Sequence, residues 1–412
     1  MISPAYSITA TERVLPRLAL DFTTGVLDPR VTVTRSLDTA TRVNSSGLVE
    51  VVNANLPRFD FNPVTLAPRG LLIEESRANL ILQSAAFDTA SWSKVLSLNV
   101  DQDAATAPDG TSSADRLRKS ATTFQAINQA ISFGSTTGTC ESVYVKRDNV
   151  DYVGFTAGGV CDLTVSLVNG SITRNSGTLA NALVTNEGNG WYRISYTISR
   201  ASGSRPTLYM WPTDVANNSS FVTVSSTASC FVWGGQVEAG AFPTSYIPTT
   251  TTSLTRNADA VTMTGANFSD WFNASEGTLV VEASTFKPTT SSSSAVVAEV
   301  NDGTLSNRNT MQYQSNLANA RTVTAGSIVV NLTQAYVANA TDKLAYAFKT
   351  NNFAFARNGS IVGSSVSATN PTVDRLTIGS FSANTAPLNG YVKTLRYYSI
   401  RLTNAELQAF ST

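Results

Sequence analysis

The stretch FVWGGQVEAGAFPTSYIPTTTTSLTR, from Phe231 to Arg256, decides how the chain divides into folded parts. It starts as a strand, breaks at paired glycines and runs through prolines into a threonine tract. Because proline cannot donate a hydrogen bond to a sheet, Pro243 and Pro248 predict the end of that sheet. Alternation along an unbroken strand would put Phe231, Trp233, Gly235 and Val237 on one face, and Val232, Gly234, Gln236 and Glu238 on the other. We interpret the stretch as a seam that closes one folded unit before the next begins.

Glu238 is the residue in this stretch that raises the question of catalysis. A glycosidase needs two carboxylates at a separation set by its mechanism. Glu238 has no partner carboxylate at a recognisable spacing, and the ExDxxE strand motif of concanavalin A-like glycosidases is absent from the sequence. We therefore predict that Gln236 and Glu238 are hydrogen-bonding residues at a strand end.

Length and composition bound the class of protein. The 412 residues exceed the size at which one hydrophobic core stops growing, so two or three domains are expected. Charged residues make up 14% and sum to zero net charge, so nucleic acid is not an expected partner. The chain has no histidine, which removes the commonest general base and metal ligand. We expect no enzyme, although a two-carboxylate glycosidase needs no histidine.

Cysteine usage and the N-terminal sequence bear on the compartment. Cys140, Cys161 and Cys230 show neither metal-site spacing nor a CxxC pair, so we expect buried thiols. The N-terminal sequence MISPAYSITATERVLPRLALDF lacks the apolar core of a signal peptide, and no apolar run approaches the length of a membrane span. We expect folding in a cytoplasm, with no signal peptide and no membrane insertion.

The fold class follows from short alternating or β-branched runs separated by glycine, asparagine and proline. We predict an all-β chain with two antiparallel β-sandwich or jelly-roll domains in tandem. Asn169-Gly170 and Asn358-Gly359 mark hairpin turns, because this pair supplies the positive φ angles of tight turns. The run KLAYAFK, from Lys343 to Lys349, predicts a half-buried strand with Leu344, Tyr346 and Phe348 on one face.

Two further patterns concern the ends of the chain. RLTNAELQAF offers Thr403 as an N-cap and Glu406 three residues later, a capping box that predicts a short C-terminal helix. TRSLDTAT from Thr34 and TRNADAVT from Thr255 share the spacing TRxxDxxT. The echo arises by chance, or the two stretches are neighbouring strands that tie the N-terminal segment to the linker.

Several stretches resemble a known family. GLLIEESRANLILQSAAFDTASW, APDGTSSADRL, GNGWYRISYT and VWGGQVEAGAFPTSYIPT resemble the carbohydrate-binding-module-like jelly roll of tailed-bacteriophage structural proteins, such as head fibres and tail fibres. The stretch LDFTTGVLDPRVTVTRSLDTATRVNSSGLVEVVNANLPRFDFNPVTLAPRG resembles the segment that precedes this jelly roll. From about Ala266, FARNGSIVG and GYVKTLRYYSIRLTNAELQAF resemble a concanavalin A-like or laminin G-like sandwich.

The resemblance implies a virion protein that folds in the host cytoplasm and leaves by lysis. It implies other virion proteins as partners and a homo-oligomer, with a trimer favoured. The expected parts are a virion-docking segment (1–69), a jelly roll (70–250), a linker (251–265) and a concanavalin A-like or laminin G-like sandwich (266–412). We expect that the docking segment does not fold alone, because it offers few strands.

Sugar recognition uses aromatic faces beside amide and carboxylate groups, which directs attention to the five tryptophans. Trp211 in TLYMWPTDVANN stands at a strand end that enters a polar loop, with Tyr209 on the same face, so this pair is the first candidate for glycan contact. Trp92 and Trp271 are weaker candidates. Trp191 and Trp233 lie in strand patterns and are predicted to be core residues.

Polar loops supply two more candidate sites. In EVNDGTLSNRNT, the side chains of Asp302, Asn307 and Arg308 are candidates for glycan contact at the rim of the last domain. In DQDAATAPDGTSSAD, four aspartates are candidate ligands for calcium, although a turn also explains Pro108-Asp109-Gly110. The four are Asp101, Asp103, Asp109 and Asp115.

Three functions are compatible with these observations. The leading hypothesis is a non-enzymatic structural and adhesion protein of a tailed-phage virion that binds host-surface glycans. The alternative is a capsid or tail decoration or scaffold protein with no glycan ligand. The third is a glycan depolymerase, which requires two carboxylates in one cleft.

Overall fold

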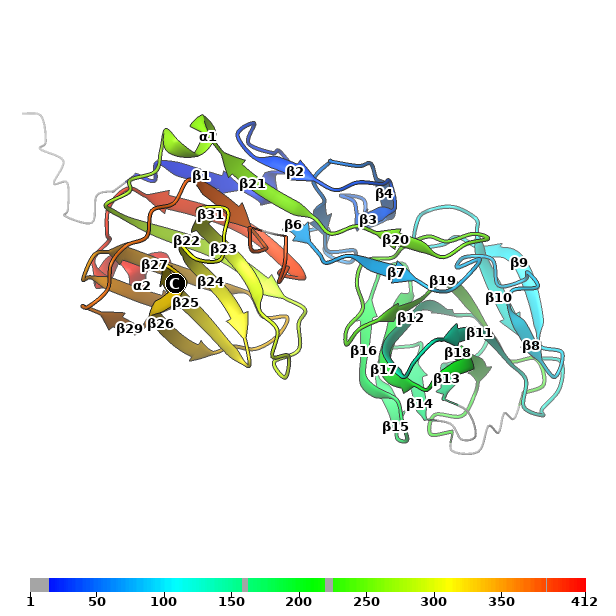
Figure 1. Ribbon diagram of the computed structural model, residues 1–412. Helices are drawn as coiled ribbons and strands as arrows, with labels where there is room; N and C mark the ends of the chain where they lie inside the picture. Colours follow the sequence, from blue (N-terminus) through cyan, green and yellow to red (C-terminus); the bar gives the residue numbers. More distant parts are fainter. Residues whose placement is uncertain (1–14, 158–161, 219–224, 383) are drawn as a thin grey trace, which may run out of the picture. The chain divides into compact units, whose positions relative to one another are not determined.

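The computed structural model describes residues 15–157, 162–218, 225–382 and 384–412, and their regular secondary structure is nearly all β (Figure 1). Contacts divide the chain into two units. Unit 1 contains the described residues up to Thr32, together with Val261–Thr285 and Thr289–Thr412. Unit 2 contains Val33–Ala260 and Phe286–Pro288. The predicted all-β fold class, with antiparallel sandwiches and a short C-terminal helix, is confirmed.

Unit 2 is built on two antiparallel sheets. The first has the order β16 (Ala180–Asn186), β17 (Trp191–Arg200), β12 (Thr137–Arg147), β19 (Ser229–Ala239), β10 (Ala114–Arg118), β9 (Asn99–Ala105). The second has the order β15 (Ile172–Asn175), β14 (Leu163–Ser166), β13 (Tyr152–Thr156), β18 (Gly203–Thr213), β11 (Ala126–Phe133), β8 (Ser93–Val95). Alternate residues of both sheets, such as Val143, Ile194 and Met210, share one buried cluster between them. Unit 2 is therefore a β-sandwich.

Shorter strand pairs complete unit 2. β3 (Ala40–Val43) pairs with β4 (Val49–Val52), β5 (Phe59–Phe61) with β6 (Pro68–Ile73), and β7 (Arg77–Asn79) with β20 (Leu254–Arg256). β2 (Thr32–Thr34) lies where the chain passes from one unit to the other. The described part of the N-terminal segment, residues 15–69, thus does not form a unit of its own: contacts group it with unit 1 up to Thr32 and with unit 2 from Val33.

The seam after β19 contains a β-bulge that the sequence pattern does not reveal. Ser142 pairs with Gln236 but Tyr144 pairs with Trp233, so Gly234 and Gly235 together oppose one residue of β12. Gly234 has a φ of 63°, which glycine adopts without strain. The predicted unbroken alternation is therefore wrong: the bulge puts Trp233 on the same face as Gln236 and Glu238.

The prediction that Gln236 and Glu238 are strand-end hydrogen-bonding residues is confirmed. Glu238 accepts hydrogen bonds from the backbone N–H of Thr244, at 3.0 Å, and from its hydroxyl. Gln236 accepts from the backbone N–H of Ile247 at 2.7 Å. Both side chains are buried. They fasten the proline-containing tail back onto the strand that it leaves, as a seam requires.

Unit 1 is a second sandwich. One sheet runs β29 (Ser360–Ser365), β28 (Phe353–Arg357), β27 (Asp342–Lys349), β22 (Glu276–Thr285), β31 (Gly390–Tyr398), with β1 (Leu18–Asp21) also on β31. The other runs β21 (Ala260–Thr264), β30 (Arg375–Ile378), β23 (Ala295–Asn301), β24 (Arg308–Gln314), β25 (Leu317–Thr324), β26 (Ser327–Ala335). A short hydrogen bond of 2.5 Å joins the hydroxyls of Thr322 and Tyr346 between the sheets. Two single-turn helices, η1 (Phe22–Thr24) and α1 (Ala266–Ser269), also belong to unit 1.

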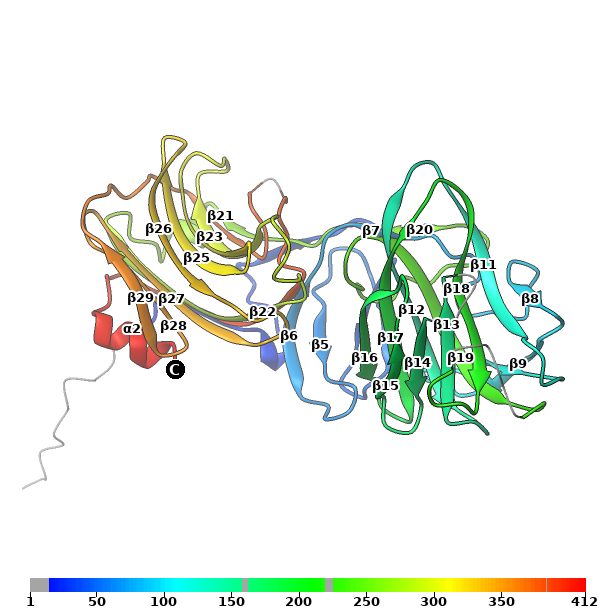
Figure 2. The same ribbon diagram turned by 90° about the horizontal axis from the view of Figure 1, so that it is seen from below.

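The C-terminal helix α2 (Asn404–Phe410) covers the outer face of the sheet that contains β27 (Figure 2). Its predicted capping box is present: the Thr403 hydroxyl accepts from the Glu406 N–H, and the Glu406 carboxylate accepts from the Thr403 N–H. In β27 the predicted alternation holds, but both faces are buried, because Ala345 and Ala347 lie under the helix. Small side chains on that face leave room for Leu407 of the helix.

The two TRxxDxxT stretches lie side by side in unit 2. The Arg35 guanidinium is paired with the Asp259 carboxylate at 2.8 Å, and the Thr39 hydroxyl donates to the Thr255 carbonyl. The interpretation that the two stretches tie the N-terminal segment to the linker is confirmed by these side-chain contacts.

Cys140 and Cys230 are buried free thiols, as predicted, whereas Cys161 lies outside the described residues. Within the ranges that the structure describes, no helix has the length and apolar character to cross a membrane.

Candidate functional site

The strongest candidate site lies on the outer face of the unit 1 sheet that contains β23 and β24. Register pairs Glu299 of β23 with Thr377 of β30 and with Thr310 of β24, and pairs Thr310 with Arg321 of β25. Directly paired residues point to the same face of a sheet. Four polar side chains therefore form one row across four strands, on the face opposite to core residues such as Met311.

Glu299, between Thr377 and Thr310 in this row, has an exposed fraction of 0%. Its Oε1 accepts a hydrogen bond of 3.1 Å from the backbone N–H of Ser382, in the segment between β30 and β31. Its Oε2 has no hydrogen-bond partner and lies 3.9 Å from Nε of Arg308, which is too far for a direct hydrogen bond. Burial raises the pKa of Glu299 to about 8, and the Arg308 charge offsets this only in part.

Two arginines flank the row. The guanidinium of Arg308 lies 4.9 Å from the ring centre of Phe381, and one of its amino groups donates to the Leu305 carbonyl. Arg321 donates from Nε to the Asn331 side-chain oxygen at 2.8 Å. Burial lowers the pKa of both arginines, and the positive charge of Arg308 lowers the pKa of Arg321 further. The two charges are therefore close enough to repel each other.

Unused hydrogen-bonding capacity is concentrated around this face. Native proteins satisfy nearly all buried polar atoms, so a group of exceptions calls for an explanation. The buried atoms without a partner include Arg308 Nε, Glu299 Oε2, Thr310 Oγ1, Gln312 Oε1, Ser380 Oγ, Ser382 Oγ and Asn384 Oδ1. An arrangement of this kind can hold a polar ligand or bridging waters by hydrogen bonds.

The predicted rim residues divide into two groups. Asp302 accepts hydrogen bonds from Thr304 and from the Asn307 side-chain amide, at 2.8 Å for the latter. The side-chain oxygen of Asn307 accepts from the Ala325 N–H at 3.0 Å. Both residues therefore hold the loop between β23 and β24 in shape. Of the three predicted residues, only Arg308 reaches the row on the sheet.

The predicted aromatic pair in unit 2 is placed differently from the expectation. Tyr209 and Trp211 do share one face of β18, as predicted, and they cluster with Phe124. Trp211, however, is 0% exposed, because its ring lies over Gly154 on the neighbouring strand and against Phe124. Tyr209 is partly buried. The expectation that Trp211 stands open at a strand end is therefore wrong.

The other tryptophans are also interior. Trp92 is 1% exposed, stacks on Phe87 with ring centres 4.2 Å apart, and donates from its indole N–H to the Gln83 carbonyl. The prediction that Trp92 is a candidate for glycan contact is therefore wrong. Trp271 packs against Phe268 and Tyr397. Trp191 and Trp233 are buried, as predicted.

The four aspartates suggested for calcium are not brought together as a metal site. Asp101 is paired with Arg116 and Arg118, and Asp109 accepts from Thr111 within its own turn. Asp115 is buried and accepts backbone N–H groups of Phe87, at 2.6 Å, and of Asp103, at 3.0 Å. Among the residues that the structure describes, no group of three or more acidic or thiol side chains could hold a metal ion.

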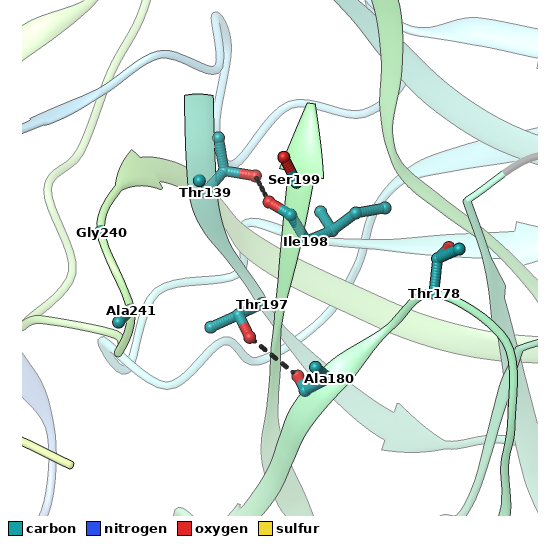
Figure 3. Close-up of a pocket in the computed structure, with 9 residues that line it drawn as sticks. Thr139, Thr178, Ala180, Thr197, Ile198, Ser199, Gly240 and Ala241 are labelled. Carbon is teal, nitrogen blue, oxygen red and sulfur yellow. Dashed lines mark hydrogen bonds between the residues drawn. The ribbon is translucent and has the colours of Figure 1, made fainter. Parts of the chain in front are cut away.

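A hollow of about 410 Å³ lies at the ends of β12, β16 and β17 in unit 2 (Figure 3). Its wall includes Gly138 and Gly240, which carry no side chains, and the hydroxyls of Thr139 and Thr197. Those hydroxyls already donate to the carbonyls of Ile198, at 3.2 Å, and Ala180, at 3.1 Å. With its threonines engaged and no titratable side chain in its lining, this hollow is a weaker candidate than the face of unit 1.

Sequence reasoning missed Glu299, Arg321 and Phe381. Glu299 sits in the run AVVAEV as an isolated charge among apolar residues, a signal that marks an unusual strand position. Arg321 and Phe381 gave no local signal, because only the pairing of β24 with β25 and the return of the chain after β30 bring them to Arg308.

No family model matches the chain, and no curated protein matches it. Among solved structures, the chain is similar to the IT-sialidase CBM40 of Ruminococcus gnavus, with a TM-score of 0.30, 14% identity, and coverage of 34% of this chain and 84% of that one. It is also similar to a botulinum neurotoxin type C structure, whose cell entry depends on two ganglioside molecules, with a TM-score of 0.30 and 10% identity. That match covers 37% of this chain and 39% of the toxin chain. The SAP-like pentraxin from Limulus polyphemus has a TM-score of 0.26 and 11% identity, with coverage of 34% of this chain and 70% of that one.

Proposed function

We propose that this chain is a non-enzymatic structural and adhesion protein of a tailed-phage virion, and that unit 1 binds host-surface glycan at the face of Glu299, Arg308 and Phe381. The observation that carries the glycan site is the 3.9 Å gap between Glu299 Oε2 and Arg308 Nε, two buried polar atoms without partners. A sugar hydroxyl both donates and accepts hydrogen bonds, so it is suited to such a gap.

The aromatic ring beside the gap supports a sugar ligand. Phe381 is partly exposed and lies against the Arg308 guanidinium. Sugar rings have apolar C–H faces as well as hydroxyls, and a binding site therefore pairs an apolar contact with a few converging polar groups. Phe381 supplies the apolar contact, and the row on the sheet supplies the polar groups.

The absence of catalysis is part of the proposal. Hydrolysis of a glycosidic bond by the usual route requires one acid and one base or nucleophile at a defined separation. Glu299 is protonated near neutral pH and is a candidate acid. The carboxylate whose charge acts on it, Asp302, is already engaged by Thr304 and Asn307. We therefore assign the face to binding.

The virion context is supported by the resemblance of the jelly-roll stretches to phage structural proteins. Other virion proteins would be the partners of the chain, and a homotrimer is the proposed assembly. Displaying several copies on one particle makes weak single-site affinity sufficient, because each bound site raises the effective concentration of the next.

Binding of the assembled protein to an array of bacterial surface polysaccharides tests the glycan proposal. We expect Phe381→Ala and Arg308→Gln to weaken binding by about three- to tenfold, the loss that corresponds to one aromatic or polar contact. Arg205→Gln is the matched control, because Arg205 is exposed in unit 2 and donates to the nearby carbonyls of Ala201 and Ser202. An array with no bound glycan, or variants that bind as the wild type does, would rule the proposal out.

A specific observation favours a decoration or scaffold role as the second candidate. The tryptophans of unit 2 are buried within that unit, so they offer no exposed aromatic surface for sugar. If the array stays empty while the protein is retained on purified particles, unit 2 and unit 1 both serve contacts between virion proteins.

A further inference from the structure

Arg321 has more donor capacity than its surroundings use. Its Nε donates to Asn331 at 2.8 Å, and one amino group approaches the Asn319 side-chain oxygen at 3.5 Å. Within the described part of the chain no carboxylate pairs with this guanidinium, and it is only partly exposed. An arginine that loses part of its hydration without gaining a counter-ion is poorly stabilised in the free protein.

A second arginine stands diagonally across the sheet. Arg308 lies two residues before Thr310 on β24, and Thr310 is the register partner of Arg321. The two positive charges influence each other, as the lowered pKa of Arg321 shows. Among the described residues, the carboxyl that faces Arg308 is that of Glu299, and its Oε2 lies 3.9 Å from Arg308 Nε with no hydrogen bond between them.

Thr310 is the direct register partner of Arg321 and lies two residues after Arg308 on the same face of the sheet. Its hydroxyl is buried and has no hydrogen-bond partner, although its neighbours on the same face are charged or polar. Two guanidinium groups and one hydroxyl on the same face of two adjacent strands match an oxyanion, because the planar fork of arginine fits the oxygens of a carboxylate, sulfate or phosphate. A solvated surface arginine would explain Arg321 alone, but it would not explain the unused hydroxyl beside it.

We propose that the glycan bound at this face carries an acidic group, which is held between Arg308 and Arg321 with Thr310 as a third donor. This inference rests on the proposed glycan-binding function and adds the class of ligand. A uronic acid, a pyruvylated sugar, a sulfated sugar or a phosphorylated sugar presents the required oxyanion. A free inorganic anion presents it as well, and the experiment must tell the two sources apart.

The test uses the assembled full-length protein on an array of bacterial polysaccharides divided into acidic and neutral members, with inorganic phosphate as competitor. We expect acidic members to be bound preferentially, and we expect Arg321→Gln to weaken that binding about tenfold, which corresponds to the loss of one charge-assisted contact. Binding of the same variant to any neutral member should stay unchanged. Arg205→Gln again serves as the control, and raising the salt concentration should weaken the acidic binding.

The outcomes separate the two proposals. If no glycan is bound, the proposed function and this inference both fail. If neutral members are bound as strongly as acidic ones, or if Arg321→Gln has no effect on binding, the glycan function stands and the acidic subsite is wrong. If millimolar phosphate binds in an Arg321-dependent way but no acidic polysaccharide does, the face is an inorganic anion site and the inference is overturned.

Discussion

Arg58 and Glu74 form an ion pair in unit 2 with 2.7 Å between Nη1 and Oε2, and neither side chain reaches solvent. The same arginine is paired with Asp259, which in turn is paired with Arg35. Glu74 is also paired with Arg256, at 3.1 Å. Three arginines and two carboxylates therefore join positions that are more than 200 residues apart in the sequence. This network fastens the N-terminal segment and the linker to the rest of unit 2.

Removing the central arginine should destabilise the protein strongly. In Arg58→Met, Glu74 and Asp259 would remain buried with each having lost one of its two paired arginines, so we expect the free energy of unfolding to fall by about 3–5 kcal/mol. Urea unfolding measures the change. The control is Arg147→Met, which breaks an exposed pair with Asp151 at 2.6 Å and should cost at most about 1 kcal/mol. Equal losses in the two variants would show that the buried network contributes no more than a surface pair.

The stability of unit 1 should depend on the protonation of Glu299. Burial raises the pKa of this carboxyl to about 8 from its ordinary value of 4.5. Between these values the folded state binds the proton and the unfolded state does not, so the free energy of unfolding should fall as pH rises through this window and level off above it. The Glu299→Gln variant has no carboxyl at this position and therefore does not titrate there. The difference in unfolding free energy between wild type and this variant, measured from pH 5 to 9, gives the contribution of Glu299 to the pH dependence of stability. A difference that does not change with pH would refute the prediction.

Local patterns and long-range pairing explain different parts of this structure. The capping box of Thr403 and Glu406 and the Asn358-Gly359 hairpin are readable from the sequence, because each depends on residues a few positions apart. The bulge at Gly234 was missed, since it appears only when β12 is placed beside β19. Arg308 was predicted for the wrong reason, as a loop residue, and it belongs to the site because β23 brings Glu299 to it.

The burial of Trp211 shows the same limit. A polar loop follows the residue, which is typical of an exposed strand end. Trp211 is instead buried, because Gly154 on the neighbouring strand has no side chain and leaves space for the indole. A Cβ at that position would lie 2.5 Å from the ring. The contact between Gly154 and Trp211 cannot be predicted from the sequence, because no residue near Trp211 specifies which residue of the neighbouring strand will face it.

The bulge in β19 should depend on glycine. Gly234 has a φ of 63°, and a Cβ there would lie 2.9 Å from the Tyr144 ring. Gly234→Ala combines a strained backbone with an overlap in a packed cluster, so we expect a loss of about 1–3 kcal/mol in urea unfolding. Gly138→Ala is the matched control, because a Cβ at Gly138 would meet no atom within 4 Å. If both variants lose the same stability, the bulge does not require glycine.

Helix α2 should stabilise unit 1 chiefly through packing and only secondarily through its cap. Leu407 is fully buried against the alanine-rich face of the sheet, so Leu407→Ala should lower the free energy of unfolding by about 2–5 kcal/mol. Thr403→Ala removes the hydroxyl that caps the Glu406 N–H and should cost about 1 kcal/mol, whereas Thr403→Ser keeps the hydroxyl and should cost far less. Gln408→Ala, at an exposed position on the same helix, controls for the change in helix propensity. A loss in Leu407→Ala no larger than in Gln408→Ala would mean that the helix is not part of the cooperative fold of unit 1.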